Sequence, residues 1–354
     1  MTALVTLALL GLAHLPSGSR VHVSSRVAVR SAVRGPAVFM AEGKKADKAA
    51  EAPTAAAEPK ETPAPPPAAP PPAPPAKPIT EGKSKEGLST ITLAHSNGDT
   101  ALVYTFGACV TSYKHKGVET LMVRPDAKMD GSKPISGGIP HCFPQFGPGE
   151  IQQHGFARNL EWEVASTSDD ADGPSVVLRL TDNAETMAMW PYAFEALYTI
   201  TLTADELKTE FVVKNTGDKA FSFTSALHSY FDVSAIKNLE IEGNFDNARY
   251  LDKMASPPAT LVHSGSTIKI SKETDQVFTG VAGQVLLKDS GKKTKLAIKT
   301  EYGWRDTVLW NPYGNEGMGY DKFVCAEAAC ASFPVTVQPG NSWTGTMDLE
   351  CSSL

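Results

Sequence analysis

The sequence holds one irregular stretch whose residue types suit ligand binding. Residues 137–158 (GGIPHCFPQFGPGEIQQHGFAR) are rich in glycine and proline and end in Gln153, His154 and Arg158. Amide, imidazole and guanidinium groups hydrogen-bond hydroxyls or anions. A long irregular stretch inside a compact domain is more often functional than decorative. A surface loop with solvated side chains is the alternative interpretation, and composition alone does not separate the two.

Two further candidates are titratable residues in apolar runs. His228 lies in SALHSYF, and imidazole is the commonest general acid or base because it titrates near neutral pH. Glu327 lies in FVCAEAAC, where a buried carboxylate is costly unless it is paired or used. A hydrogen-bonded core histidine and a glutamate facing water are the alternatives. Each residue is a candidate for proton transfer.

Other catalytic patterns are missing from the sequence. No G-x-S-x-G surrounds Ser225, so a hydrolase triad of Ser225, His228 and Asp232 is not expected. The eight histidines form no H-x-x-x-H or H-E-x-x-H, and neither a G-x-x-x-x-G-K loop nor a dinucleotide fingerprint is present. We therefore expect no catalytic metal.

Tryptophans are a weaker signal for sugar binding. Trp162, Trp190, Trp304 and Trp310 could stack on a sugar ring, although buried tryptophans in a β-sandwich core are the commoner outcome.

The elements that must position these residues have the pattern of β-strands. Short apolar or alternating runs, rich in β-branched and aromatic residues and separated by turn residues, occupy 90–123, 175–182, 194–231, 284–302 and 335–351. No segment keeps a helical apolar period over about 12 residues or more. We predict an all-β fold, a large antiparallel β-sandwich with almost no helix, over residues 86–354.

Charge and cysteine content exclude some classes of protein. After residue 80 the chain has 24 basic and 34 acidic side chains, a net charge of −10. A non-specific nucleic-acid binder needs clustered Lys and Arg, so no nucleic-acid partner is expected. The five cysteines contain no C-x-x-C spacing, which favours buried reduced thiols over a disulfide framework.

The N-terminal region predicts targeting. Residues 3–13 are apolar but shorter than the ~20 residues of a membrane-spanning helix. Residues 17–41 contain four arginines, several serines and no acidic residue. We predict a leader over 1–41, signal-like in 1–16 and transit-like in 17–41, which resembles the bipartite leaders that direct proteins to complex plastids in algae. The stroma is the expected location, with mitochondrial and secretory addresses as alternatives.

A linker should separate the leader from the sandwich. Twelve of the 26 prolines lie between Pro53 and Pro78, mixed with alanine, so residues 42–85 are predicted to be a disordered Pro/Ala-rich spacer. After leader cleavage we expect no membrane contact, and we expect a monomer.

Several motifs resemble one family in order and spacing. They are residues 137–164 with Q-H-G-F-A-R, LHSYFDVS (227–234), ETDQVF (273–278), DTVLWNP (306–312), FVCAEAA (323–329) and VTVQPGNSWTG (335–345). Together they resemble the glucose-6-phosphate 1-epimerases, the hexose-phosphate branch of the aldose 1-epimerase (mutarotase) superfamily, over nearly all of residues 88–350.

This resemblance implies a β-supersandwich with an open groove, in which a hexose 6-phosphate exchanges its α and β anomers without a cofactor. By the family pattern Glu327 is the general base on the anomeric hydroxyl and His228 protonates the ring oxygen. Gln153, His154, Arg158 and Asp275 would hold substrate, with Arg158 on the phosphate. Asp306 would support the same groove.

The sequence departs from the family pattern at Ser136, where an arginine usually precedes G-G-I-P and grips the phosphate. Either Lys133, three residues earlier, is the substitute, or the preferred substrate is different. An aldose 1-epimerase acting on unphosphorylated sugar and a non-catalytic carbohydrate-binding sandwich are the alternatives. A glycoside hydrolase needs two paired carboxylates, and a histidine with a glutamate is the wrong pair.

Overall fold

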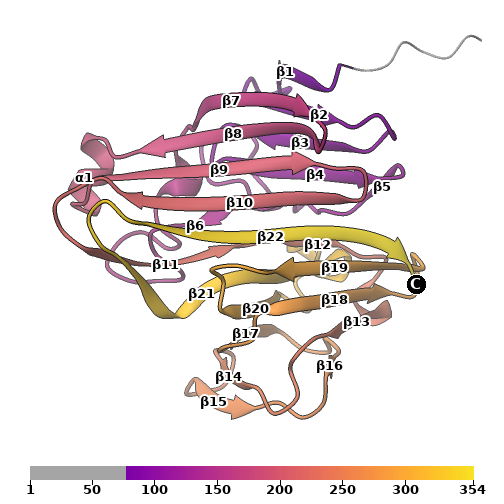
Figure 1. The fold of residues 1–354 in the computed structure, drawn as a ribbon. Coiled ribbons are helices and arrows are strands. Elements are labelled where there is room, and N and C mark those ends of the chain that lie inside the picture. Colours follow the sequence, from indigo (N-terminus) through magenta and orange to yellow (C-terminus); the bar gives the residue numbers. More distant parts are fainter. Residues whose placement is uncertain (1–76) are drawn as a thin grey trace, which may run out of the picture. The chain divides into compact units, whose positions relative to one another are not determined.

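The computed structural model describes residues 77–354 (Figure 1). The predicted leader (1–41) and most of the predicted linker (42–85) lie outside the described residues. Within the described part, helix is limited to α1 (Ala184–Met189) and four short 3-10 turns, η1 (Ala157–Asn159), η2 (Ile236–Asn238), η3 (Glu316–Met318) and η4 (Tyr320–Lys322). All pairs of neighbouring strands are antiparallel, which confirms the predicted all-β class.

The first sheet has five strands and begins earlier than predicted. Its order is β1 (Ile79–Lys83), β2 (Ser89–Ala94), β3 (Thr100–Tyr104), β4 (Cys109–His115) and β5 (Val118–Glu119). The predicted linker ran to residue 85, but β1 pairs in register with β2. Only Ile79 in β1 is even partly buried. Composition therefore gave no strand signal, and backbone pairing to β2 holds this segment.

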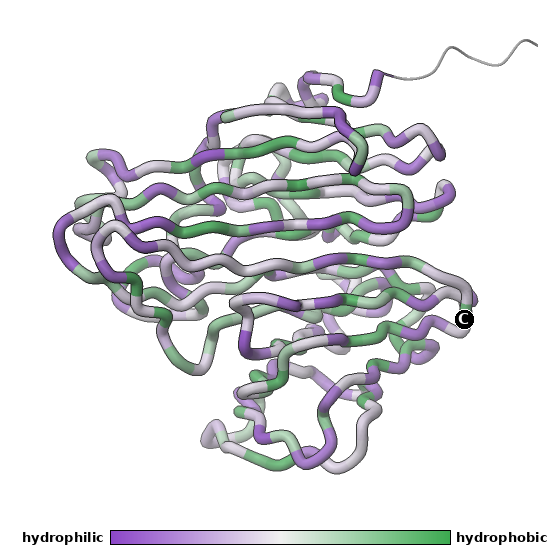
Figure 2. Tube along the Cα trace, viewed as in Figure 1, coloured by the Kyte–Doolittle hydropathy of each residue, from purple (hydrophilic) through white to green (hydrophobic). Residues whose placement is uncertain are grey.

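A nine-stranded sheet forms one face of the sandwich. Its order is β16 (Thr267–Ile268), β13 (Leu239–Glu242), β18 (Gly283–Asp289), β19 (Thr294–Thr300), β22 (Ser342–Ser353), β10 (Glu206–Asn215), β9 (Phe194–Leu202), β8 (Gly173–Thr181) and β7 (Glu163–Asp170). Buried and half-buried residues alternate strictly along β9, and Figure 2 shows the matching alternation of hydropathy along the neighbouring strands. This period of two directs one face of the sheet into the core.

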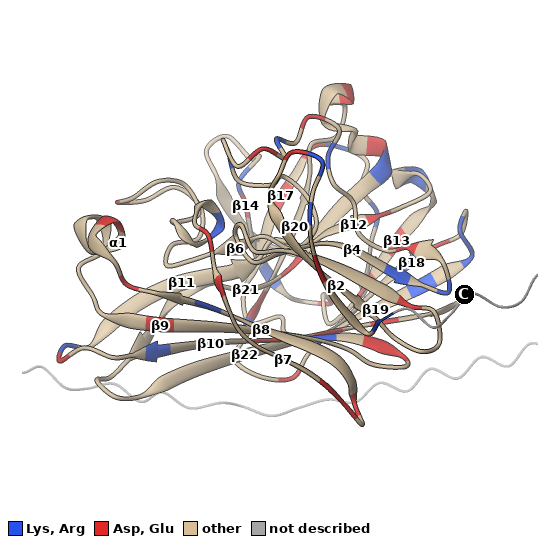
Figure 3. Ribbon diagram, turned by 90° about the horizontal axis from the view of Figure 1, so that it is seen from above, with Lys and Arg blue, Asp and Glu red and all other residues tan. Residues whose placement is uncertain are grey.

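An eight-stranded sheet forms the opposite face. Its order is β15 (Ala259–Val262), β14 (Arg249–Asp252), β17 (Thr274–Phe278), β20 (Asp306–Asn311), β21 (Phe323–Val337), β11 (Phe221–Leu227) and β6 (His141–Cys142), and β12 (Tyr230–Asp232) also pairs with β21. The first eight residues of β21 are all buried, because both sides of this central strand are covered. Figure 3 shows this layer above that of β7–β10 and β22.

The core lies between the two larger sheets. Aromatic rings from both layers meet there, as in the contacts of Phe143 with Phe211 and of Phe223 with Trp343. Trp162 and Trp304 are 2% and 4% exposed and belong to this core, so neither is free to stack on a sugar. All five cysteines are free thiols, and four of them are buried, as predicted. No helix among residues 77–354 has the length and apolar character needed to cross a membrane.

Candidate active site

A cavity of about 400 Å³ lies against the eight-stranded sheet. Strand register explains why residues far apart in sequence meet there, because directly opposed residues in antiparallel strands project on the same face. Asp275 of β17 opposes Trp310 of β20, which opposes Cys325 of β21, which in turn opposes Tyr230 of β12. The next row places Val308 of β20 opposite Glu327 of β21. All of these residues except Cys325 line the cavity.

The irregular stretch 137–158 contributes Gln153, His154 and Arg158 to the cavity lining. Gly155 has a φ of 72°, and a Cβ there would overlap the carbonyl oxygen of Phe143, so only glycine fits. The preceding His154 has a φ of 65°, which is unusual for a residue with a side chain. Its Nδ1 accepts a hydrogen bond from the backbone N–H of Gly147 at 3.1 Å. The loop therefore orients the imidazole.

The two predicted proton-transfer residues meet in the cavity. Nδ1 of His228 lies 3.4 Å from Oε1 of Glu327, and the residues are 9% and 2% exposed. The imidazole stacks on Tyr230 with ring centroids 4.9 Å apart and lies edge-on to Trp310. Oε2 of Glu327 has no hydrogen-bond partner among the described residues. A buried carboxylate oxygen without a partner is available to a bound ligand.

Burial governs the titration of this pair. Loss of solvation raises the pKa of Glu327 well above its usual value, with Asp275 adding to the rise. Loss of solvation, aided by His154 and Arg158, lowers the pKa of His228 well below its usual value. Burial also lowers the pKa of His154 to about 3. The carboxylate is thus a stronger base than an exposed glutamate, and the imidazolium of His228 is a stronger acid than an exposed histidine.

Three cationic side chains line the same cavity. Nη2 of Arg158 donates to the backbone oxygen of Gln153 at 2.9 Å, while its buried Nε has no partner among the described residues. Nζ of Lys253 lies 3.1 Å from Oδ1 of Asp275. The cavity therefore combines an acid–base pair with positive charge and with hydrogen-bonding groups of both kinds.

Arg124 is the third cation, and the sequence alone did not single it out. Its Nε and Nη2 donate to Asp126, and its guanidinium lies 6.0 Å from the Trp310 ring. Its backbone N–H donates to the backbone oxygen of Ser136 at 2.9 Å. Arg124 therefore lies beside the residue where the family arginine is expected.

Two predicted site residues lie outside the cavity lining. Lys133 is exposed and is not among the lining residues. Asp306 is 3% exposed, and its carboxylate accepts hydrogen bonds from the backbone N–H groups of Gly280, Ala331 and Ser332. Through these three hydrogen bonds Asp306 ties β20 to β21 and to the turn that follows β17.

Four lining residues were missed or only partly foreseen: Arg124, Tyr230, Lys253 and Trp310. Trp310 was one of four tryptophans considered for stacking, and Tyr230 lies two residues after His228 in the same motif. Lys253 follows the short strand β14 and Arg124 follows an isolated β-bridge at Val123, both in stretches without a motif. No group of three or more His, Cys, Asp or Glu residues in the described chain is arranged to hold a metal ion.

Comparisons with known proteins point to one family. The sequence profile described as aldose 1-epimerase matches residues 89–350. A protein of Cenchrus ciliaris, provisionally named glucose-6-phosphate 1-epimerase, is 32% identical over 290 residues, which cover 75% of this chain and 86% of that protein. A protein of Escherichia coli K12 with the same provisional name is 29% identical over 269 residues, 72% of this chain and 87% of its own.

A solved structure shares the fold. The crystal structure of a protein from Salmonella typhimurium, provisionally described as a mutarotase, superposes with a TM-score of 0.70 at 25% identity. The match covers 78% of this chain and 94% of that one.

Proposed function

Because the chain belongs to the aldose 1-epimerase family, we propose that it interconverts the α and β anomers of a hexose 6-phosphate, with glucose 6-phosphate as the substrate. One observation carries this proposal: the buried pair His228 and Glu327 lies in the same cavity as Arg124, Arg158 and Lys253. The pair supplies proton transfer, and the cations supply a place for a phosphate. The provisional names of the relatives in Cenchrus ciliaris and Escherichia coli support the same substrate.

The reaction needs one proton removed and one delivered at each stage. Glu327 takes the proton of the anomeric hydroxyl while His228 gives a proton to the ring oxygen, so the C1–O5 bond breaks and C1 becomes the free aldehyde. Rotation about C1–C2 presents the other face of the carbonyl. Reclosure reverses both transfers, and no proton is gained or lost. Each positioned transfer typically contributes about 10²- to 10⁴-fold.

The remaining cavity residues position the sugar. Asp275 accepts hydrogen bonds from sugar hydroxyls, and Lys253 holds its carboxylate in place at 3.1 Å. Gln153 and His154 contact hydroxyls from the loop above. Trp310 offers a ring face or edge against the apolar side of the sugar.

Arg158 and Arg124 bind the phosphate in this proposal. Arginine suits phosphate because its planar donors form charge-assisted, often bidentate, hydrogen bonds. Asp126 accepts hydrogen bonds from Nε and Nη2 of Arg124 and so holds its guanidinium in place. Arg124 thus takes the role for which Lys133 was a candidate substitute.

An unphosphorylated aldose is the second candidate substrate, because Ser136 lines the cavity where the family arginine is expected. A hydroxyl there suits a sugar hydroxyl as well as a phosphate oxygen. The two candidates share the acid–base chemistry and differ only in whether the arginines are needed.

Conservative variants test the chemistry. Glu327→Gln and His228→Asn should each lower the anomer exchange rate of glucose 6-phosphate by at least about 10²-fold while leaving its binding within a few fold. The matched changes Glu273→Gln and His263→Asn lie outside the cavity lining and should leave exchange unchanged. Unchanged exchange in either cavity variant would refute the assigned roles.

A further inference from the structure

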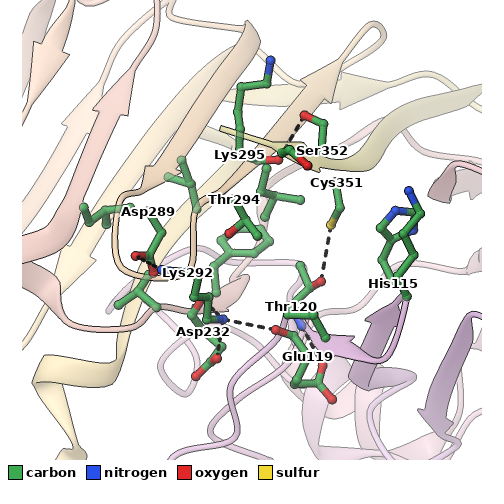
Figure 4. A pocket seen from close by; sticks show the side chains of 18 residues that line it. His115, Glu119, Thr120, Asp232, Asp289, Lys292, Thr294, Lys295, Cys351 and Ser352 are labelled. Carbon is green, nitrogen blue, oxygen red and sulfur yellow. Dashed lines mark hydrogen bonds and ion pairs between the residues drawn. The ribbon is translucent and has the colours of Figure 1, made fainter. Parts of the chain in front are cut away.

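A second cavity of about 220 Å³ shares no lining residue with the candidate active site (Figure 4). Its walls come from β5, β12, the beginning of β19 and the end of β22. It is larger than the roughly 150 Å³ engineered cavity that admits benzene. The space is therefore sufficient for a ring-sized ligand.

The floor of this cavity is apolar. It is formed by five buried side chains, Phe231, Val233, Leu239, Leu287 and Leu296. Ligand sites are typically hydrophobic concavities with a few placed polar groups. A ligand that covers this floor with an apolar body removes its surface from water.

The carboxylates of the lining are already satisfied within the protein. Glu119 accepts hydrogen bonds from three backbone N–H groups and one serine hydroxyl. Asp232 is paired with Nζ of Lys292 at 2.5 Å. Asp289 accepts from Ser234 and from the backbone of Gly291 and Lys292. The carboxylates of Glu119 and Asp289 are therefore occupied by hydrogen bonds from within the protein, and that of Asp232 is paired with a lysine.

Two lysines of the cavity lining are not paired with an acidic residue. The amines of Lys116 and Lys295 have no ion-pair or hydrogen-bond partner among residues 77–354. In Figure 4 Lys295 stands at one edge of the cavity with its amine turned outward, and its flexible stem can carry that amine across the opening. The lining holds three acidic and three basic residues, and Lys116 and Lys295 are the charged groups among them whose hydrogen-bonding capacity is open to a ligand.

We propose that this cavity binds a small molecule with an apolar body and a single carboxylate. The apolar body covers the floor of Phe231 and the leucines, and the carboxylate meets Lys295 and Lys116. This site goes beyond the proposed epimerase function and does not depend on it.

The probe is 4-fluorophenylacetate, titrated into the full chain and followed by the ¹⁹F line width. Its neutral isostere 4-fluorophenylacetamide should bind at least about five-fold more weakly, since it keeps the ring and loses the charge. Acetate should not compete, because it lacks the apolar body. Saturating glucose 6-phosphate should not displace the probe. Equal binding of acid and amide, displacement by glucose 6-phosphate, or no broadening up to about 10 mM probe would overturn the proposal.

Charge variants locate the site without disturbing the core. In the double variant Lys116→Gln, Lys295→Gln the preference for acid over amide should fall toward one. The matched control is Lys293→Gln. Lys293 is exposed, lies two residues before Lys295 and does not line the cavity, so this variant should keep the preference for acid over amide. A preference that survives in the double variant, or that falls equally in Lys293→Gln, contradicts the assignment.

Discussion

His228 and Glu327 approach each other to 3.4 Å between Nδ1 and Oε1, and burial shifts their pKa values in opposite directions. Each shift favours the neutral form of its group, since a low-polarity site destabilises both charges. Glu327 is therefore a more avid proton acceptor, and protonated His228 a more ready donor, than the same residues in water. This pairing is what an acid–base ring opening requires in both directions.

The pH dependence of exchange should report the pair of His228 and Glu327. Ring opening needs ionised Glu327 and protonated His228 together, so kcat should follow a bell-shaped pH profile, lost at acid pH as the carboxylate is protonated and at alkaline pH as the imidazolium loses its proton. The profile of kcat is the measurement, as it reports groups in the enzyme–substrate complex. A kcat that keeps rising with pH and shows no alkaline fall would contradict the assignment of His228 as acid.

Arg124 should determine phosphate affinity. Arg124→Gln is expected to raise KM for glucose 6-phosphate by about 10-fold, or about 1.4 kcal/mol, with little change in kcat, because the guanidinium binds substrate and transition state alike. Steady-state exchange kinetics measure this. Lys133→Gln is the matched control and should leave KM unchanged, as Lys133 does not line the cavity. A larger effect at Lys133 would assign the phosphate contact to that residue instead.

Substitutions of Asp275 and Asp306 should have opposite effects on KM and on the free energy of unfolding. Asp306→Ala leaves three buried backbone N–H groups without an acceptor and should lower the free energy of unfolding by roughly 2–4 kcal/mol, with KM nearly unchanged. Asp275→Ala should raise KM with a small effect on stability, because its partner Lys253 is partly exposed. Urea unfolding and exchange kinetics on both variants decide this. A KM effect at Asp306 larger than at Asp275 would place Asp306 in the site.

Buried histidines should make the fold sensitive to acid. His141 is fully buried among Trp162, Tyr198 and Phe211, neither ring nitrogen has a partner in the described chain, and burial lowers its pKa to about 3. The unfolded chain binds a proton at this site below about pH 6.5, so stability falls as pH drops from there toward 3. At pH 5 the loss is about 2 kcal/mol for one such histidine.

His141→Leu removes this loss. The variant should therefore lose less stability than the parent between pH 7 and pH 5, as measured by urea unfolding at both values. His95→Leu, which removes a partly exposed histidine, is the control. An equal loss of stability in parent and His141→Leu would show that the histidine is not the source.

The sequence was sufficient for the fold class and for much of the site because both depend on local patterns. Alternation over 194–231 predicted β9 to β12, and the motif around His154 and Arg158 marked the loop that covers the cavity. Glu327 was a candidate because a carboxylate in an apolar strand is costly to bury unless it is paired or used.

The other site residues depend on register, which alternation does not specify. Trp310 faces the cavity because it lies opposite Asp275 on one side and Cys325 on the other. Lys253 follows β14, and Arg124 follows the isolated bridge of Val123 with Gly137, and only these pairings bring the two residues to the cavity. Asp306 belongs to a family motif, yet its carboxylate accepts hydrogen bonds from backbone N–H groups. Its residue type alone does not reveal this structural role.

The most direct test is saturation-transfer NMR of the anomeric protons of glucose 6-phosphate, and separately of glucose, with and without the full chain. We predict that catalytic amounts of protein accelerate exchange of glucose 6-phosphate far more than that of glucose, and that Glu327→Gln abolishes the acceleration. Equal acceleration of both sugars would contradict the role of the arginines in phosphate recognition. Exchange of glucose 6-phosphate at the uncatalysed rate would contradict the proposed epimerase activity.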